Sequence, residues 1–334
     1  MNEQFKLSVD KLGKYIDKSN NIVVIGHQSP DGDAVGSILA VYNFFTKKGK
    51  NIVPVLPDPM PEFLNWLPAA NKVVDGENAI KHIKQADLII CIDFNEQKRV
   101  GELSDYLRNS NAVKILIDHH VEPENFAQVM FSYPTAGSSA EIVYRILKGL
   151  DKELLDKQIA TCIFTGLITD TGCFCHDSAG YETFETAAEL MKYDIDKQEI
   201  INHLYHSYSY DRMRLMGYVL EKKMQLTDQG KIAYITLTED ELKQFNYKSG
   251  DHENFVNLPL SIKTVQVSFF ILENGDKIKI SIRSKGKVDV NELARKFFAG
   301  GGHKKAAGGS WEGSMQSLIN LLTNEVTQYI NEKL

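Results

Sequence analysis

The sequence predicts an α/β protein of two domains: a larger N-terminal domain built on a mostly parallel sheet, and a smaller α+β C-terminal domain with a mixed sheet. The chain has 334 residues, enough for two domains of about 100–200 residues each. In its first half, continuous apolar runs alternate with helical patterns, which is typical of parallel sheets. From about residue 231 the pattern changes to alternating strands and short helices. We expect domains at 1–185 and 226–334, joined by a helical connector at 186–225.

Four apolar runs in the N-terminal domain predict strands covered on both faces, because the runs are continuous and do not alternate. They lie at residues 21–27, 51–56, 87–93 and 114–120. A helix is expected at about 33–48, between the first two strands. Two more are expected after the last strand, at 138–150 and 154–169.

The C-terminal half follows a segment, 183–224, that contains no strand-like run and should be helical. A strand is expected at 231–237. Two alternating runs then flank Asn274-Gly275, a dipeptide typical of a tight hairpin turn. A short helix at about 289–298, a glycine-rich turn and a helix at about 315–333 complete the predicted domain.

Composition and charge exclude several classes of protein. The chain is 43% hydrophobic and 25% charged, which is ordinary for a globular protein and excludes a disordered one. No apolar run approaches the roughly 18 residues of a membrane span, and no apolar signal-peptide core is present at the N-terminus. Four cysteines are too few for a disulfide scaffold, so a cytoplasmic protein with free thiols is expected. The net charge of −6 argues against a protein that coats nucleic acid.

Acidic and histidine side chains follow the apolar runs of the N-terminal domain. The carboxyl ends of parallel strands share one edge of a sheet, where open α/β folds build their sites. Side chains far apart in the sequence can therefore converge at this edge. The residues expected there are His27, Asp31, Asp33, Asp93, His119 and Asp170.

A cluster of carboxylates with two imidazoles is costly unless positive charge lies among them, and a pair of divalent cations supplies it. Mixed carboxylate and imidazole ligands fit Mn²⁺ better than Mg²⁺ or Ca²⁺. Asp93, at the end of a central strand, is the expected bridge between two ions about 3.5–4 Å apart, the spacing of two-metal phosphoester hydrolysis. Each motif alone has an ordinary alternative, since Asp-Gly-Asp is also a common turn and helix cap. The prediction rests on their combination.

Four segments of this domain resemble the motifs of the DHH phosphoesterase superfamily: GHQSPDGDAVGS (26–37), CIDFN (91–95), IDHH (117–120) and GLITDTG (166–172). FAGGGHKKAAGG (298–309) is similar to the GGGH loop of the DHH-associated C-terminal domain. The resemblance covers nearly the whole chain. The compact length resembles the stand-alone nanoRNase/pAp-phosphatase branch, whereas RecJ exonucleases are longer and membrane-anchored cyclic-di-AMP phosphodiesterases carry spans and sensor domains. Family II pyrophosphatases lack the GGGH loop.

The resemblance implies ligands for two Mn²⁺ ions, which Mg²⁺ or Co²⁺ could replace. One ion would be held by His27, Asp31 and Asp93. The ligands of the second would be Asp33, Asp93, His119 and Asp170. Asp118 would orient an imidazole instead of binding an ion directly. His120 would lie close to the scissile phosphate, where it would polarise the phosphate or assist proton transfer.

A glycine-rich loop and a basic segment in the C-terminal domain suggest where substrate binds. Gly300, Gly301 and Gly302 have no Cβ and would let backbone amides approach a phosphate, with His303 adding a donor. A helix C-cap followed by a flexible turn is the alternative. Residues 277–305 carry nine Lys and Arg against two acidic residues, a local charge of +7 in a chain whose total is −6.

Two further residues are expected to contact substrate. Arg283, at the end of a strand, is the expected phosphate clamp, and the resemblance places such an arginine opposite the metals. Ser138 would either face the substrate at a helix N-terminus or only cap that helix.

The resemblance implies a cytoplasmic, Mn²⁺-dependent phosphodiesterase that uses two-metal activation of water on oligoribonucleotides of about two to five nucleotides. The products would be nucleoside 5′-monophosphates, and 3′-phosphoadenosine 5′-phosphate (pAp) would be converted to AMP. Two alternatives stay open: hydrolysis of pApA or cyclic di-AMP at the same site, or a non-catalytic nucleotide- or RNA-binding module. The expected partners are short oligoribonucleotides and small adenylate nucleotides, without a membrane. A homodimer is a family-level expectation.

Overall fold

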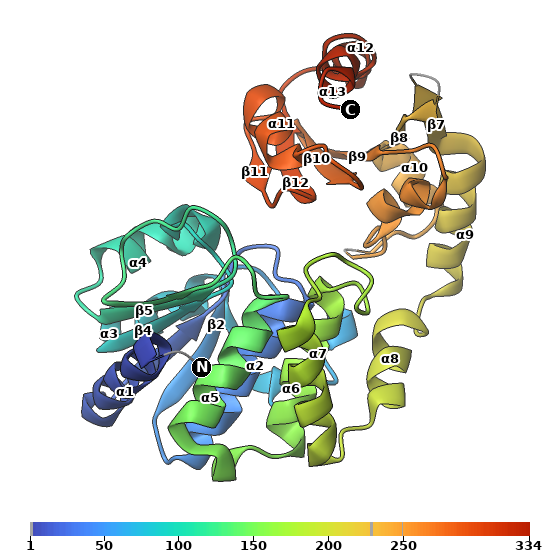
Figure 1. Ribbon diagram of the computed structural model, residues 1–334. Coiled ribbons are helices and arrows are strands. Elements are labelled where there is room, and N and C mark those ends of the chain that lie inside the picture. The colour runs from blue at the N-terminus through green and yellow to red at the C-terminus, as the bar shows by residue number, and fades with distance from the viewer. Residues whose placement is uncertain (1–2, 228–229, 249) are drawn as a thin grey trace. The chain divides into compact units, whose positions relative to one another are not determined.

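The computed structural model describes residues 3–227, 230–248 and 250–334. The chain divides into two compact units, Met1–Ser207 (unit 1) and Tyr208–Leu334 (unit 2), shown in Figure 1. Each unit contains its own sheet and its own buried apolar clusters. Over the described ranges, none of the helices is both long and apolar enough to cross a membrane.

Unit 1 is built on a six-stranded parallel sheet in the order β3-β2-β1-β4-β5-β6. Its strands are β1 (Ile22–Ile25), β2 (Ile52–Leu56), β3 (Val74–Asp75), β4 (Leu88–Ile92), β5 (Val113–Asp118) and β6 (Val129–Ser132). Ile25 of β1 pairs with Cys91 of β4, and Ile92 pairs with Ile117 of β5. The carboxyl ends of these three strands therefore reach the same edge of the sheet.

Helices cover both faces of this sheet, as the continuous apolar runs predict. Val24 and Ile90 pack with α1, α2, α5 and α6 in one cluster, whereas Val23 and Ile89 pack with α3 and α4 in another (Figure 1). The helices of unit 1 are α1 (Glu3–Lys18), α2 (Gly32–Lys47), α3 (Ile80–Gln85), α4 (Ser104–Asn109), α5 (Ser139–Asp151), α6 (Lys157–Asp170), α7 (Tyr181–Leu190) and α8 (Lys197–Tyr205). The segment Gln97–Leu103 between β4 and α4 forms 3₁₀ turns.

Unit 2 has a mixed six-stranded sheet in the order β11-β12-β10-β9-β8-β7, in which the β8–β9 pair is parallel and the other pairs of the described strands are antiparallel. Its strands are β7 (Met224–Thr227), β8 (Ile232–Leu237), β9 (Val267–Asn274), β10 (Lys277–Ser284), β11 (Gly301–Gly302) and β12 (Ala306–Trp311). Its helices are α9 (Tyr210–Tyr218), α10 (Glu239–Gln244), α11 (Val290–Phe297), α12 (Met315–Leu321) and α13 (Thr327–Asn331). Phe269 of β9 packs with α11 and α12 on one face, and Phe270 packs with α9 and α10 on the other.

The predicted fold class is confirmed, with local differences. The two-residue turn of the hairpin is Gly275-Asp276, one position later than expected, because Asn274 still pairs with Lys277. Gly275 has a φ of +62°, and glycine at the first turn position is typical of a type II′ turn. β9 is buried continuously instead of alternately, because apolar clusters cover both its faces. Of the expected connector at 186–225, α8 lies in unit 1 and α9 in unit 2.

Candidate metal centre

The carboxyl edge of the parallel sheet gathers all six side chains that the sequence marks as metal ligands. His27, Asp93 and His119 follow the ends of β1, β4 and β5, and each is at most 5% exposed. Asp33 lies in the first turn of α2 and is also buried. The remaining two are more exposed: Asp31 at the N-cap of α2 and Asp170 at the end of α6.

One group of ligand-type atoms forms around His27. Its Nε2 lies 3.5 Å from Oδ2 of Asp93 and 3.9 Å from Oδ1 of Asp31. Its Nδ1 lies 2.8 Å from the backbone oxygen of Gln28, which can only accept a hydrogen bond. The proton of a neutral imidazole is therefore held on Nδ1, and the lone pair of Nε2 faces the two carboxylates.

A second group forms around His119 in the same way. Its Nε2 lies 3.5 Å from Asp170 Oδ2, 3.6 Å from Asp93 Oδ1 and 4.0 Å from Asp33 Oδ2. Its Nδ1 lies 3.3 Å from the backbone oxygen of Ala136. The two oxygens of Asp93 thus face different imidazoles, Oδ2 toward His27 and Oδ1 toward His119.

These separations fit a bound cation better than they fit hydrogen bonds. Nitrogen–oxygen distances of 3.5–4.0 Å exceed the usual hydrogen-bond range. Two ligand atoms that each lie about 2.1 Å from one ion are about 3.0–4.2 Å apart, depending on the angle between them. Moreover, imidazole lone pairs that face carboxylate lone pairs repel one another unless a positive charge lies between them. The donor set therefore fits divalent cations of the kind that accept mixed nitrogen and oxygen ligands.

The charge balance of the metal-free cluster leads to the same conclusion. Burial, together with the negative charges of Asp93 and Asp170, raises the pKa of Asp33 well above its ordinary value. Burial raises the pKa of Asp170 to about 6, although the nearby His119 opposes this shift. The cluster therefore holds more negative charge than its surroundings compensate, which is what a bound cation would relieve.

Asp93 differs from the other carboxylates because three imidazoles surround it. Burial alone would raise the pKa of Asp93, but contact with His27 and the charges of His120 and His119 hold it below its usual range. Conversely, burial alone would lower the pKa of His27, but Asp93 and Asp31 together raise it above its ordinary value. Asp93 is therefore the carboxylate of the cluster that is most firmly held in its charged form.

The backbone of Asp93 is also unusual, with a φ of +65° in the left-handed region that non-glycine residues rarely adopt. Its amide donates a hydrogen bond of 2.9 Å to the backbone oxygen of Ile117, which continues the β4–β5 ladder by one residue. A strained conformation that its surroundings fix in this way is frequent at functional sites.

The N-terminus of α5 supports the cluster from the other side, through contacts with Asp33 and Asp93 that the sequence did not predict. The amides of Ser139 and Ala140 donate to Asp33 at 2.7 and 2.9 Å, and the Ser139 hydroxyl donates to Asp93 Oδ1 at 2.8 Å. Ser138 is buried, and its hydroxyl accepts from the Glu141 amide, as an N-cap does. That is one of its two expected roles, and substrate contact by Ser138 stays a prediction. The adjacent serines were the only sequence signal available for these contacts.

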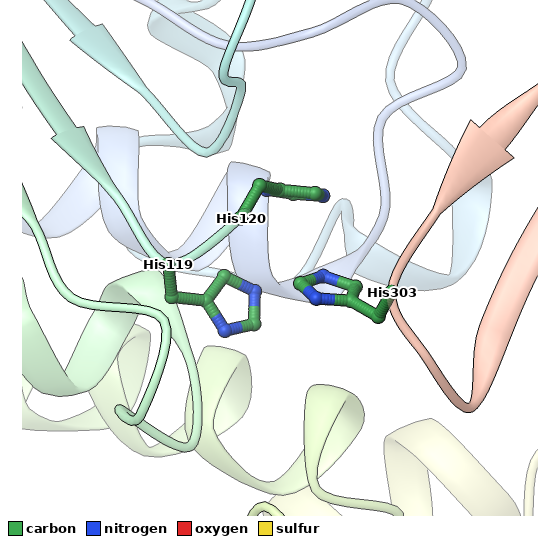
Figure 2. Close-up of side chains that lie close together, drawn as sticks. All are labelled: His119, His120 and His303. Carbon is green, nitrogen blue, oxygen red and sulfur yellow. The ribbon is translucent and has the colours of Figure 1, made fainter. Parts of the chain in front are cut away.

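His120 and Asp118 form a pair beside the cluster. Nδ1 of His120 lies 2.7 Å from Oδ1 of the fully buried Asp118, whose Oδ2 has no hydrogen-bond partner among the described residues. Figure 2 shows the His119 and His120 side chains leaving the chain where β5 ends, and their rings meet edge to face at 5.1 Å. Asp118 thus contacts one ring nitrogen of His120 and orients the imidazole.

The remaining predicted residues lie in unit 2, on neighbouring strands. Arg283 is partly buried near the end of β10 and pairs with Ala306 of β12. His303, also labelled in Figure 2, opens the turn between β11 and β12, where its amide donates to the Ala306 oxygen at 2.7 Å. Lys304 and Lys305 form the tip of this turn. Arg283 and the GGGH segment therefore belong to one corner of the sheet of unit 2.

Packing explains why Gly300 and Gly302 are glycines, which the sequence did not predict. A Cβ at Gly300 would lie 1.9 Å from the Gly308 oxygen, and one at Gly302 would lie 2.5 Å from the Ala306 oxygen. The Gly300 and Gly302 amides already donate to the Ala294 oxygen and to Asn291 Oδ1. Close packing against β12 thus requires glycine here, and phosphate contact by these amides stays a prediction.

Comparison with known proteins places the chain in a family. Residues 21–167 match the model of the DHH family, N-terminal domain, and residues 229–332 match that of the DHHA1 domain. The chain is 31% identical over 293 residues to the bifunctional oligoribonuclease and PAP phosphatase NrnA of Thermus thermophilus, covering 87% of this chain and 84% of that protein. This chain belongs to the DHH phosphoesterase family. It is therefore a hydrolase of the NrnA-like branch.

Two further comparisons cover nearly the full length of this DHH protein. The probable bifunctional oligoribonuclease and PAP phosphatase NrnA of Streptococcus mutans is 29% identical over 326 residues, covering 95% of this chain and 99% of that protein. The crystal structure of an exopolyphosphatase-related protein from Bacteroides fragilis is 40% identical, with a TM-score of 0.91, covering 97% of this chain and 96% of that one. The fold of both units is therefore shared with that solved structure.

Proposed function

We propose that this DHH protein is a cytoplasmic, Mn²⁺-dependent phosphodiesterase that degrades oligoribonucleotides of about two to five nucleotides to nucleoside 5′-monophosphates and converts pAp to AMP. The observation that carries the proposal is the cluster of carboxylates and imidazoles at the carboxyl edge of the unit 1 sheet. The names of the Thermus and Streptococcus relatives support the choice of substrates. The four cysteines are free thiols, which fits a reducing compartment.

Two Mn²⁺ ions are the proposed occupants of the cluster. His27, Asp31 and Asp93 would hold the first ion. Asp93 would also contribute to the second ion, whose ligands would be Asp33, Asp93, His119 and Asp170. The opposite directions of the two Asp93 oxygens support this sharing. When bound, such a pair of cations lowers the pKa of water and offsets charge on the phosphoryl oxygens. Mg²⁺ or Co²⁺ are possible replacements.

His120 is the proposed proton-transferring residue. Asp118 lies 2.7 Å from its Nδ1 and orients the ring; when the ring is protonated, its Nε2 would hydrogen-bond a phosphoryl oxygen or give a proton to the leaving oxygen. Asp118 is fully buried, so its carboxylate contacts the imidazole and not solvent. Asp118 would thereby act through His120 and not on the substrate itself.

Unit 2 is proposed to bind the phosphate groups of the substrate. Arg283 can hold a phosphate with two parallel hydrogen bonds, and His303 adds a donor on the adjacent turn. The two lysines at the tip of that turn add positive charge for a substrate with several phosphates. Binding of only a terminal phosphate or nucleotide would favour short substrates. The homodimer stays a prediction.

The experiment that tests this proposal compares the full-length protein on several substrates in Mn²⁺. The panel contains a ladder of oligoribonucleotides from dimer to 24-mer, pAp, pApA and cyclic di-AMP. We expect fast release of nucleoside monophosphates from dimers to pentamers, phosphate release from pAp, and slow attack on the 24-mer. Faster degradation of the 24-mer than of the dimer would overturn the preference for short substrates. Hydrolysis of cyclic di-AMP alone would assign the site to that nucleotide, and binding without any hydrolysis would indicate a non-catalytic module.

A further inference from the structure

Ser139, the first residue of α5, contacts two candidate ligands from different elements. Its hydroxyl donates a hydrogen bond of 2.8 Å to Oδ1 of Asp93, which follows β4. Its amide donates a hydrogen bond of 2.7 Å to Oδ2 of Asp33, in the first turn of α2. Ser139 is fully buried, and the Ala140 amide adds a third hydrogen bond, to Asp33 Oδ1. One residue therefore joins the two carboxylates that lie deepest in the cluster.

The hydrogen bond from the Ser139 hydroxyl restricts rotation of the Asp93 carboxylate. Oδ1 of Asp93 accepts this bond and also lies 3.6 Å from Nε2 of His119. A carboxylate oxygen has two lone-pair directions, so a donor fixed on one of them aims the other. The strand does not set this angle, since Asp93 lies beyond the end of β4 in the left-handed conformation. The orientation of the shared carboxylate therefore depends on a side-chain donor.

We propose that Ser139 is a positioning residue, whose hydroxyl orients the Asp93 carboxylate. This orientation would set the affinity of the cluster for the cation that Asp93 and His119 both hold. This inference rests on the proposed function, because it assumes that the cluster binds divalent cations. Residues that hydrogen-bond to metal ligands typically change metal affinity by about 10–100-fold when they are removed. The alternative is a structural role, in which the hydroxyl only satisfies a buried carboxylate of the fold.

Metal titration separates the two roles. A structural role would lower the melting temperature of the metal-free protein and leave its affinity for Mn²⁺ unchanged. A positioning role moves the Mn²⁺ concentration at half-saturation. Ser139→Ala removes the hydroxyl and keeps the amide that holds Asp33, and alanine suits the first turn of a helix. Ser139→Thr restores a hydroxyl at the same place. Ser268→Ala is the matched control, because Ser268 is equally buried and its hydroxyl has no partner among the described residues.

The experiment titrates chelator-treated, full-length protein with Mn²⁺ and records both bound metal and melting temperature. We expect the Mn²⁺ concentration at half-saturation of one site to be at least about tenfold higher in Ser139→Ala than in the wild type. Ser139→Thr should recover most of this loss, and Ser268→Ala should titrate as the wild type does. Unchanged affinity in Ser139→Ala, or equal weakening in Ser139→Thr, would overturn the inference. A wild-type protein that binds no Mn²⁺ would instead refute the proposed function.

Discussion

At the scale of single residues, Asp93 shows most clearly how chemistry outweighs local preference. Its φ of +65° costs a non-glycine residue energy, and glycine would adopt it more readily. Glycine, however, has no carboxylate to face His27 with one oxygen and His119 with the other. Because the ladder bond to Ile117 and the Ser139 hydroxyl fix the residue at both ends, the strain persists where the carboxylate is needed.

Replacement of Asp93 tests this interpretation. Asparagine tolerates the left-handed region, so Asp93→Asn should keep the melting temperature of the metal-free protein near that of the wild type. Phosphate release from pAp in Mn²⁺ should fall by about 10³-fold, because the shared charge is lost. Asp93→Ala should be as inactive but less stable by about 1 kcal/mol, since alanine is strained at this φ. If Asp93→Asn kept a tenth of the wild-type rate, Asp93 would not be a shared ligand.

His252 gives a prediction for pH in unit 2. Burial, with the positive charges of Lys279 and Arg212, lowers the pKa of His252 to about 4. Its ring stacks on Phe270 at 5.4 Å, and its Nδ1 lies 2.5 Å from the Tyr247 hydroxyl. In the unfolded chain the same group takes up a proton near its ordinary pKa of about 6.5. As pH falls from 6.5 toward 4, protonation therefore favours the unfolded state, and this contribution to stability is lost.

The measurement compares urea unfolding at pH 7 and pH 4.5 for the wild type and His252→Phe. The variant keeps an aromatic ring on Phe270 but cannot take up a proton. We expect the free energy of unfolding of the wild type to fall by about 2 kcal/mol more than that of His252→Phe over this interval. Equal losses in the two proteins would show that His252 has the same protonation state in the folded and the unfolded protein, which would contradict the prediction.

At the scale of elements, three helices pack unusually closely beside the candidate metal centre. α2, α5 and α6 lie side by side in unit 1 (Figure 1) and share one apolar cluster. A Cβ at Gly36 of α2 would lie 2.4 Å from the Cys162 oxygen of α6. A Cβ at Gly166 of α6 would lie 2.7 Å from the Ala140 Cβ and 2.8 Å from Asp33 Oδ1. Glycine therefore allows the N-terminus of α5 to reach the Asp33 carboxylate.

A methyl group at Gly166 should disturb both stability and the site. Gly166→Ala must displace Ala140 or Asp33, so we expect a loss of about 1–3 kcal/mol in the free energy of unfolding and weaker Mn²⁺ binding. Gly149→Ala is the control in α5, because its Cβ would lie at an ordinary 3.4 Å from Val9 and alanine favours helix by about 0.5–1 kcal/mol. Urea unfolding and Mn²⁺ titration measure the two effects. A Gly166→Ala protein as stable as Gly149→Ala would contradict the packing argument.

An element could be predicted from the sequence where burial of its own apolar side chains stabilises it. The strands β1, β2, β4 and β5 could be predicted because burial on both faces requires continuous apolar runs. β12 could not, since Ala306–Trp311 contains two glycines that serve close packing and no apolar run. The six ligand-type residues followed from strand ends and motif resemblance. Ser139 was missed as a contact of Asp93 because this hydrogen bond joins residues 46 positions apart.

At the scale of the whole molecule, charge and chemistry are divided between the two units. The six candidate ligands all lie in Met1–Ser207, and the basic segment 277–305 lies in Tyr208–Leu334. The total charge of −6 therefore conceals an acidic cluster suited to cations and a basic corner suited to phosphate. A negative net charge is therefore compatible with a small, phosphate-rich substrate.

This division predicts an unequal response to metal. Cations that bind only the folded form of unit 1 stabilise that unit, by about 2.7 kcal/mol at a 100-fold excess over the Kd. In differential scanning calorimetry of the full-length protein, Mn²⁺ should raise the transition of unit 1 and leave that of unit 2 in place. In Asp93→Asn, the same Mn²⁺ concentration should shift neither. An equal rise of both transitions in the wild type would place cation binding outside the proposed cluster.

The most direct test of the central claim is metal removal and return in a single assay of the wild-type protein. Phosphate release from pAp and monophosphate release from a ribonucleotide dimer are measured after chelation, and again as Mn²⁺ is added. We predict no hydrolysis of either substrate after chelation, and recovery of both activities over the same range of Mn²⁺ concentration. Undiminished hydrolysis in the chelated protein would contradict a phosphodiesterase that works through cations held by His27, Asp93 and His119.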